Sequence, residues 1–304
     1  MKNYFKIIIV LIGFVTLIVV SCNEKNHNLE GNDSILEGKI SVLVDESILP
    51  IVDDEKIVFE NKYKATINLI PQSEKEAINS LLNNKANVIV LTRKLNQNET
   101  KKFSNKKIKP RTVPFATDAI VFVKNKKSSD TIIDLTDVIS FLNGTKNGIK
   151  GLVFDNPNSS SVRFLCELAK IKELPENNVF SFKTNEEVIN YVSKNDGLIG
   201  VVGINWLSQP RPEMQETVNS LQILSVKSAD NQYVYPSQDN IAQNKYPLAR
   251  ELYIINCQGY EGLGMGFSSF IGGEIGQRII LKSGLVPVRF PSRQIVTRTQ
   301  LEKK

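Results

Sequence analysis

Three consecutive serines, Ser159, Ser160 and Ser161, are the residues whose type and position best suggest a binding site. They follow a short apolar segment, Leu152–Phe154, and a polar turn, Asp155–Asn158, and they precede apolar residues at helical spacing. We therefore expect them at the start of a helix, where free N–H groups and the positive end of the helix dipole attract anions. An ordinary capped turn between a strand and a helix is the alternative, and spacing alone favours it.

Polar side chains also follow two other predicted strands, Lys39–Val44 and Asn87–Leu91: Asp45, Glu46 and Ser47 after the first, Thr92 and Arg93 after the second. Strands that alternate with helices at this spacing predict βαβ units and a parallel sheet. Ligands bind such sheets beyond the carboxyl ends of the strands. The three polar groups are therefore expected to meet at one site.

The sequence offers little for catalysis or for metal binding. Its one histidine, His27, lies in a polar segment that cannot form a core. The folded part therefore has no histidine that could activate a nucleophile or bind a metal. We expect that the protein is not an enzyme and that it binds no cofactor and no metal. Cys166 and Cys257 fall in apolar segments and are expected to be buried thiols.

The N-terminus has the pattern of an export signal. Lys2 and Lys6 precede an apolar run that ends at Val20, which is shorter than a typical membrane span. The following residues complete a Val-Val-Ser-Cys sequence that resembles the lipobox of bacterial lipoproteins. This resemblance implies a signal peptide over residues 1–22, lipidation at Cys22, and a flexible tether over residues 23–37.

The rest of the chain has the composition of a globular protein. Hydrophobic residues make up 41% of the chain and charged residues 23%, and the formal net charge is +6. This charge is small and scattered, so nucleic acid is not an expected partner. Apolar residues at helical spacing predict one long helix over Phe267–Ser283 near the end of the chain.

Four stretches in a fixed order resemble the PstS family of periplasmic phosphate-binding proteins of ABC importers: Gly38–Ser47, Pro114–Asn125, Asp196–Gly203 and Tyr246–Pro287. The resemblance implies a two-lobed α/β fold of the type II periplasmic-binding-protein class, with a ligand cleft between the lobes. It places the two crossover strands at Ala119–Asn125 and Leu252–Asn256. Lobe 1 would comprise residues 38–124 and 251–304, and lobe 2 residues 125–250.

The resemblance and the predicted helix start together give the expected ligand-binding residues, which are Ser47, Thr92, Arg93, Asp118, Ser159, Ser160 and Ser161, with Arg163 added as a substitute for a family arginine. The sequence also departs from the family pattern. The first ligand loop contains Asp45 and Glu46 where the family has small neutral residues, and Asp155 stands where the family has arginine. Arg163 could replace that arginine or face solvent.

Carboxylates near a bound phosphate would repel it. Either some of these acids point away or the ligand is another oxyanion. The resemblance favours a lipid-anchored protein on the periplasmic face of an envelope membrane that delivers phosphate or a related oxyanion to an ABC permease. The alternative is a PstS-like scaffold that serves as a non-catalytic interaction protein, for example with TonB-type energising machinery.

Overall fold

The computed structural model describes residues 33–145, 148–227 and 231–292, in a compact unit that begins at Asp33. The expected signal peptide, Cys22, His27 and most of the expected tether lie outside the described residues. Asp33 accepts hydrogen bonds from the Tyr260 hydroxyl at 2.9 Å and from the Leu263 N–H at 2.6 Å. The folded body therefore begins a few residues before Gly38.

In the described ranges, ten strands form one curled sheet in the order β2-β1-β3-β12-β4-β8-β6-β7, with β9 and β13 also paired to β4. A separate sheet has the order β11-β10-β5. The strands are β1 (Glu37–Asp45), β2 (Lys64–Gln72), β3 (Val88–Leu91), β4 (Arg111–Asn125), β5 (Ile132–Ile133), β6 (Leu152–Phe154), β7 (Val179–Ser181), β8 (Ile199–Gly203), β9 (Leu221–Ile223), β10 (Ser225–Lys227), β11 (Tyr233–Val234), β12 (Ala249–Asn256) and β13 (Val286–Pro287).

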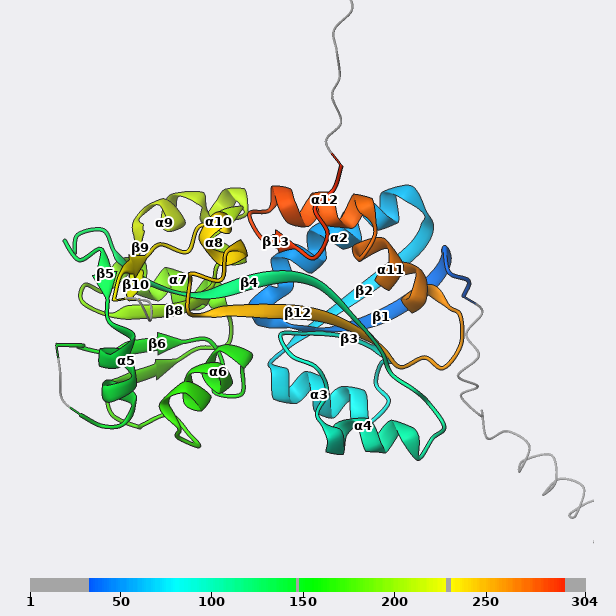
Figure 1. Cartoon of the computed structure of the whole chain (residues 1–304), viewed down its shortest axis with the longest axis horizontal. Coiled ribbons are helices and arrows are strands. Elements are labelled where there is room, and N and C mark those ends of the chain that lie inside the picture. Colours follow the sequence, from blue (N-terminus) through cyan, green and yellow to red (C-terminus); the bar gives the residue numbers. More distant parts are fainter. Residues whose placement is uncertain (1–32, 146–147, 228–230, 293–304) are drawn as a thin grey trace, which may run out of the picture. The chain divides into compact units, whose positions relative to one another are not determined.

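The long strand β4 joins the two halves of the large sheet (Figure 1). Its first part, Arg111–Ala119, pairs with β12, and its last part, Ile120–Asn125, pairs with β8 and β9. We call the half built on β1, β2 and β3 the first lobe and the half built on β6, β7 and β8 the second lobe. The described residues thus have the two-lobed α/β fold that the sequence predicts.

The first expected crossover, Ala119–Asn125, lies where β4 changes partners. The second expected crossover, Leu252–Asn256, pairs along its length with β3 or β4 of the first lobe. The chain returns to the first lobe earlier, because Leu248 already accepts the N–H of Ile120 on β4 at 3.0 Å. Pairing with β4 therefore starts with β12 at Ala249, and pairing with β3 starts at Tyr253.

Helices cover both faces of each half of the sheet (Figure 1). On the first lobe, α3 and α4 lie on one face, and α2, α11 and α12 lie on the other. The helices are α2 (Leu49–Lys62), α3 (Glu74–Leu82), α4 (Gln97–Ser104), α5 (Leu135–Leu142), α6 (Ser160–Ala169), α7 (Asn185–Lys194), α8 (Asn205–Ser208), α9 (Gln215–Asn219), α10 (Gln238–Ala242), α11 (Leu263–Ile271) and α12 (Glu274–Lys282), with short 3₁₀ turns η1 (Glu46–Ile48) and η2 (Pro212–Met214).

The prediction of a single helix over Phe267–Ser283 is wrong. The chain forms α11 and α12, which are separated by Gly272 and Gly273. A Cβ atom on Gly273 would lie 2.9 Å from the carbonyl oxygen of Ser269, so a larger residue would crowd the preceding helix. Hydrophobic spacing does not reveal this break, because both helices face the same core.

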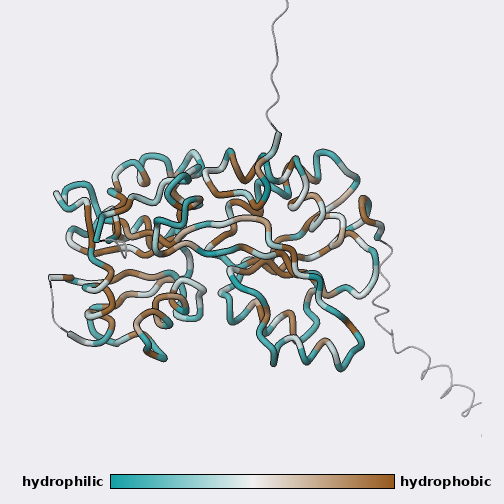
Figure 2. Tube along the Cα trace, in the orientation of Figure 1, coloured by the Kyte–Doolittle hydropathy of each residue, from teal (hydrophilic) through white to brown (hydrophobic). Residues whose placement is uncertain are grey.

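Hydrophobic residues are concentrated along the strands (Figure 2). The largest cluster of buried side chains includes Val42, Phe122 and Val201, so it is continuous from one lobe to the other. Cys166 and Cys257 are buried and unbonded to each other, as predicted. In the described part of the chain, no helix has the length and apolar character needed to span a membrane.

Glu55 of α2 is fully buried, although its carboxyl group lies in an otherwise apolar row with Val52 and Phe59. Neither carboxyl oxygen has a hydrogen-bond partner among the described residues. Burial, together with the nearby Asp54, raises the pKa of Glu55 to about 9. A buried carboxyl group without partners destabilises the fold.

We predict that Glu55→Met stabilises the protein, because methionine fills a similar space without a polar group to desolvate. The expected gain at pH 5 is about 1–3 kcal/mol, the usual cost of a buried polar group without a partner. Because the pKa of Glu55 is raised in the folded state, wild-type stability falls as the pH rises from the unfolded value of 4.5 towards 9. The gain should therefore be larger at pH 8.5, as measured by urea unfolding, and a smaller gain there would contradict this account.

Candidate functional site

The loop that follows β1 is fixed by contacts with the second lobe. Asp45 Oδ1 accepts the N–H of Ser47 at 3.1 Å, which closes a tight turn. The carbonyl oxygen of Ser47 accepts hydrogen bonds from Asn205 Nδ2 at 2.9 Å and from Trp206 Nε1 at 3.1 Å. Asn205 and Trp206 belong to α8, so this loop of the first lobe is held by a helix of the second.

The serine triplet lies at the N-terminus of α6, as predicted. Ser159 is the N-cap residue, and its Oγ accepts the N–H of Val162 at 3.2 Å. The same hydroxyl donates to Asp155 Oδ1 at 2.6 Å. Ser160 and Ser161 are completely buried, and Ser161 Oγ has no hydrogen-bond partner among the described residues.

Ser47 and Ser160 meet an ion pair in the interior. The two hydroxyl oxygens are 3.0 Å apart, and Arg250 Nη1 donates to Ser160 Oγ at 3.1 Å. Arg250 also binds both oxygens of Asp118, with Nε–Oδ1 and Nη2–Oδ2 distances of 3.0 and 2.8 Å. All four side chains are buried. We call Ser47, Asp118, Ser160 and Arg250 the serine–arginine cluster.

Asn185, the first residue of α7, connects two buried acids. Its backbone N–H and its Nδ2 donate to the carboxyl group of Glu46 at 3.0 and 2.7 Å. Nδ2 also donates to Asp155 Oδ2 at 3.2 Å. Glu46 and Asp155 therefore approach each other from different lobes, and with Asp45 they form a group that we call the acid cluster.

Burial is the main cause of the raised pKa values in the acid cluster. It raises the pKa of Asp45 to about 6, with a further contribution from the charge of Glu74. Burial and the neighbouring Asp155 raise the pKa of Glu46 to about 8. Burial raises the pKa of Asp155 to about 7, partly offset by its hydrogen bond from Ser159. Near neutral pH the cluster therefore retains protons, and a neutral carboxyl group can donate a hydrogen bond.

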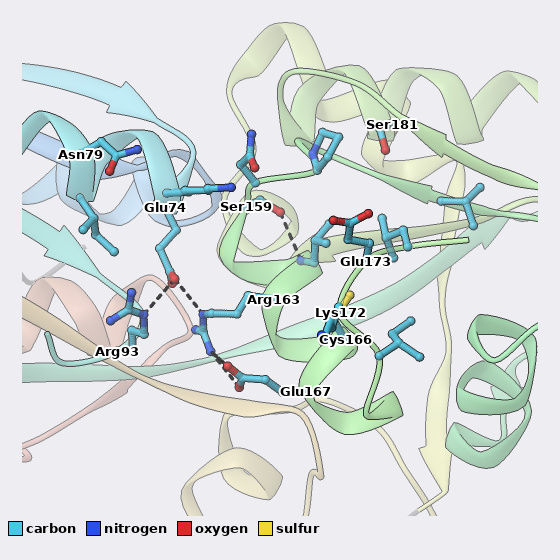
Figure 3. Close-up of a pocket in the computed structure, with 18 of the residues that line it drawn as sticks. Glu74, Asn79, Arg93, Ser159, Arg163, Cys166, Glu167, Lys172, Glu173 and Ser181 are labelled. Carbon is cyan, nitrogen blue, oxygen red and sulfur yellow. Dashed lines mark hydrogen bonds and ion pairs between the residues drawn. The ribbon is translucent and has the colours of Figure 1, made fainter. Parts of the chain in front are cut away.

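A cavity of about 770 Å³ lies beside these buried clusters, between α3 and α4 of the first lobe and α6 of the second. Figure 3 shows Glu74 between Arg93 and Arg163 in this cavity. The other lining residues include apolar side chains of both lobes, such as Ile78 and Val162.

Arg93 and Arg163 lie on this cavity and outside the serine–arginine cluster. Glu74 Oε1 accepts from Arg93 Nε at 2.9 Å and from Arg163 Nε at 2.8 Å. Arg93 also binds Glu99 through two hydrogen bonds of 2.9 Å, and Arg163 binds Glu167. These ion pairs connect α3 of the first lobe with α6 of the second at the cavity wall.

A backbone hydrogen bond also joins the two lobes beside this cavity. The N–H of Lys75 in α3 donates to the carbonyl oxygen of Asn158, just before α6, at 3.2 Å. Thr92 contacts both sides, since its hydroxyl is 3.4 Å from Glu74 Oε2 and 3.4 Å from Arg163 Nη2. The lobes are therefore in contact both in the interior and at the cavity.

The expected site residues thus fall into two neighbouring groups. The buried group contains Asp45, Glu46, Ser47, Asp118, Asp155, Ser159, Ser160 and Ser161. The cavity group contains Arg93 and Arg163, which line the cavity, and the buried Thr92, which contacts Arg163, with Ser159 shared by both groups. The side chains of the first group, apart from Ser161, take part in the hydrogen bonds described above. The second is joined through Glu74, which the sequence did not single out.

Arg250 and Asn185 were also missed. Arg250 lies opposite Asp118 in the pairing of β12 with β4. It also lies in the Tyr246–Pro287 stretch, which is one of the four stretches that resemble the PstS family. Only the need for a cation beside several buried acids could have drawn attention to it. Asn185 has no sequence feature that marks it as a binding residue. Among the residues that the structure describes, no group of three or more potential ligands could hold a metal ion.

Comparison with known proteins places the chain in a family. A family model for the PBP superfamily domain matches residues 32–274. The phosphate-binding protein PstS of Borreliella burgdorferi is 26% identical over 309 residues, which cover 93% of this chain and 99% of that protein.

Solved structures show the same fold. A protein described as a phosphate ABC transporter substrate-binding protein, from Clostridium perfringens with bound phosphate, matches with a TM-score of 0.69 and 18% identity over 83% of this chain and all of that chain. An ABC-type phosphate transport receptor of Vibrio cholerae matches with a TM-score of 0.62 and 16% identity over 82% of this chain and all of that one. The predicted two-lobed fold and the resemblance to phosphate-binding proteins are both confirmed.

We predict that Glu74→Gln weakens the contact between the lobes. Glu74 is buried between two guanidinium groups, and a neutral side chain of the same shape would leave them without a shared counter-charge. The expected loss is about 1.5–3 kcal/mol of unfolding free energy, the usual size for hydrogen bonds to charged groups. Urea unfolding at low and high salt measures it, and the difference should shrink at high salt.

Glu173→Gln is the matched control. Glu173 lines the same cavity, but it takes part in none of the ion pairs among the described residues. Its substitution should leave stability within about 0.5 kcal/mol of wild type, as for most surface changes. Equal effects of the two substitutions would show that the Glu74 contacts contribute no special stability.

Proposed function

The chain belongs to the PBP superfamily domain family, and from this membership we propose that it is a solute-binding protein that binds phosphate or a related oxyanion. In this proposal it is exported, is anchored by lipid to the periplasmic face of an envelope membrane, and delivers its ligand to the permease of an ABC importer. Binding, rather than catalysis, is its activity.

The observation that carries the proposal is the serine–arginine cluster. Ser47 comes from the first lobe, Ser160 from the second, and Arg250 from the strand β12 that follows the return to the first lobe. Ser47 Oγ and Arg250 Nη1 lie 3.0 and 3.1 Å from Ser160 Oγ. Two hydroxyl groups and one guanidinium group are suitable partners for an oxyanion.

The N-terminus of α6 adds further donors. Its first N–H groups have no acceptors within the helix, and they lie at the positive end of the helix dipole. A ligand between Ser47 and Ser160 would separate their hydroxyl groups and contact both lobes. We therefore propose that the oxyanion replaces the direct hydrogen bond between these two serines.

Charge is the main objection to an oxyanion at this position. Two like charges 4 Å apart repel by about 4 kcal/mol at an effective dielectric of 20. The pKa values of Asp45, Glu46 and Asp155, which burial raises to about 6, 8 and 7, weaken this objection because neutral acids do not repel an anion.

The relatives support the same ligand. The Borreliella protein bears the name of a phosphate-binding protein, and the Clostridium perfringens structure contains bound phosphate. The Vibrio cholerae relative is an ABC-type phosphate transport receptor, which supports an ABC permease as the partner of this chain.

We predict that the purified protein without its lipid binds phosphate or sulfate, and that Ser160→Ala weakens this binding about 2-fold to 13-fold, which corresponds to one lost hydrogen bond. Ser160 donates or accepts at the centre of the proposed site, whereas alanine cannot. Calorimetric titration with phosphate, sulfate and a neutral sugar measures the affinities. Bound anion should also raise the melting temperature by mass action.

Ser193→Ala is the control, because Ser193 donates only to the carbonyl oxygen of Asn190 within its own helix. It should bind anions like the wild type. The absence of heat and of thermal shift with every anion at millimolar concentration, in protein shown to be folded, would rule out the proposed function.

The lipid anchor rests on the sequence Val19-Val20-Ser21-Cys22. In bacterial cells we predict a mature protein whose first residue is Cys22 with attached acyl chains, and a Cys22→Ser precursor that stays uncleaved and unlipidated. Mass spectrometry of the N-terminus distinguishes these forms. A mature chain that begins at another residue, without acyl chains, would exclude the anchor.

A further inference from the structure

The buried clusters contain more acids than cations. Asp45, Glu46 and Asp155 are all at most 8% exposed. Arg250 is the guanidinium group buried beside them, and both its Nε and its Nη2 are used by Asp118. If all four acids were ionised, the interior would hold several like charges with one cation. Such an arrangement is strongly unfavourable.

One atom of this group is left without a partner. Asp45 is completely buried, and its Oδ1 accepts the N–H of Ser47, but its Oδ2 has no hydrogen-bond partner among the described residues. Ser161 Oγ, in the first turn of α6, is also buried without a partner. A hydroxyl group or a protonated carboxyl group in this situation requires an acceptor. An oxyanion supplies several hydrogen-bond acceptors, so it could accept from both groups.

The charged groups that face the acid cluster come from several elements. They are Asp118 of β4, Arg250 of β12, Glu74 of α3 and, through Glu74, Arg93 after β3 and Arg163 of α6, while α7 contributes the neutral Asn185. Arg93 and Arg163 are both bound to Glu74. Additional protons are therefore the simplest source of the positive charge that a bound anion needs.

We propose that this site takes up its oxyanion together with protons, which reside on the carboxyl groups of Asp45, Glu46 and Asp155, and that Asp45, whose Oδ2 has no hydrogen-bond partner among the described residues, binds the anion as a hydrogen-bond donor. This inference rests on the proposed function. The protons come from the solvent, and no covalent bond is made or broken. A site built from donors favours oxyanions that carry no proton of their own, so sulfate should bind as well as phosphate.

The electrostatic environment of the acids agrees with this mechanism. Burial raises the pKa of Glu46 to about 8 and that of Asp155 to about 7. A nearby anion raises such pKa values further, because a like charge disfavours the ionised form. Anion binding should therefore draw protons from the solution at neutral and weakly alkaline pH, where these groups are partly ionised.

Sulfate is the suitable probe, because it remains doubly charged over the whole pH range of interest and contributes no proton. The wild-type protein without its lipid is titrated with sulfate at pH 7.5 in two buffers that differ in their ionisation enthalpy, and then with phosphate. We expect the heat of sulfate binding to depend on the buffer, with an uptake of about one proton per anion. Affinity for sulfate should also fall as the pH rises to 9.

Asp155→Asn should reduce the proton uptake, and Glu46→Gln provides a second variant should the first not fold. Glu55→Met is the matched control, because Glu55 is an equally buried acid that makes no side-chain hydrogen bond to either cluster. It should retain the wild-type uptake.

The outcomes separate this inference from the proposed function. Sulfate binding with the same heat in both buffers would overturn proton uptake and leave the proposed function intact. Binding of phosphate without binding of sulfate would also overturn it, since that preference requires an ionised carboxylate that accepts a proton from the ligand. Binding of neither anion would overturn the proposed function and this inference with it.

Discussion

The ion pair between Arg250 and Asp118 is the interaction on which the buried site depends. These residues are cross-strand neighbours on β12 and β4, and β4 is shared by both halves of the large sheet. Either group alone in this interior would be an uncompensated charge, which is far less stable than the pair. Their pairing fixes the direction of the guanidinium group, so that its remaining nitrogen reaches Ser160. The position of the serine helix and the closeness of the two lobes follow from that contact.

The same constraint explains why the acids are tolerated. Asn185 holds Glu46 and Asp155 with its backbone and its amide, and its own amide oxygen accepts the N–H of Gly203 at 3.2 Å. A neutral residue with several donors lets two carboxyl groups lie close together without a second cation. The interior therefore combines one strong ion pair with carboxyl groups that can gain or lose a proton. At the cavity the arrangement is different, because Arg93 and Arg163 are partly exposed to solvent and form ion pairs with the buried Glu74.

Local features of the structure could be predicted from the sequence, whereas long-range pairings could not. The start of α6 at the serine triplet depends on neighbouring residues and a capping side chain, and the structure confirms it. The burial of both cysteines follows from the apolar pattern around them. The pairing of Arg163 with Glu74 and the role of Arg250 depend on segments far apart in the chain, about which spacing contains no information. The break at Gly272 and Gly273 depends on how closely two helices approach, which residue patterns do not encode.

The hydrogen bond from Trp206 Nε1 to the carbonyl oxygen of Ser47 has a practical consequence. This is the single tryptophan of the chain, and it contacts the very loop that carries Asp45 and Glu46. Indole fluorescence depends on the polarity and hydrogen bonding around the ring, so emission from this protein arises next to the proposed ligand loop. Any separation of that loop from α8 would change the emission without an attached dye. The molecule thus contains its own optical reporter for the opening of the two lobes.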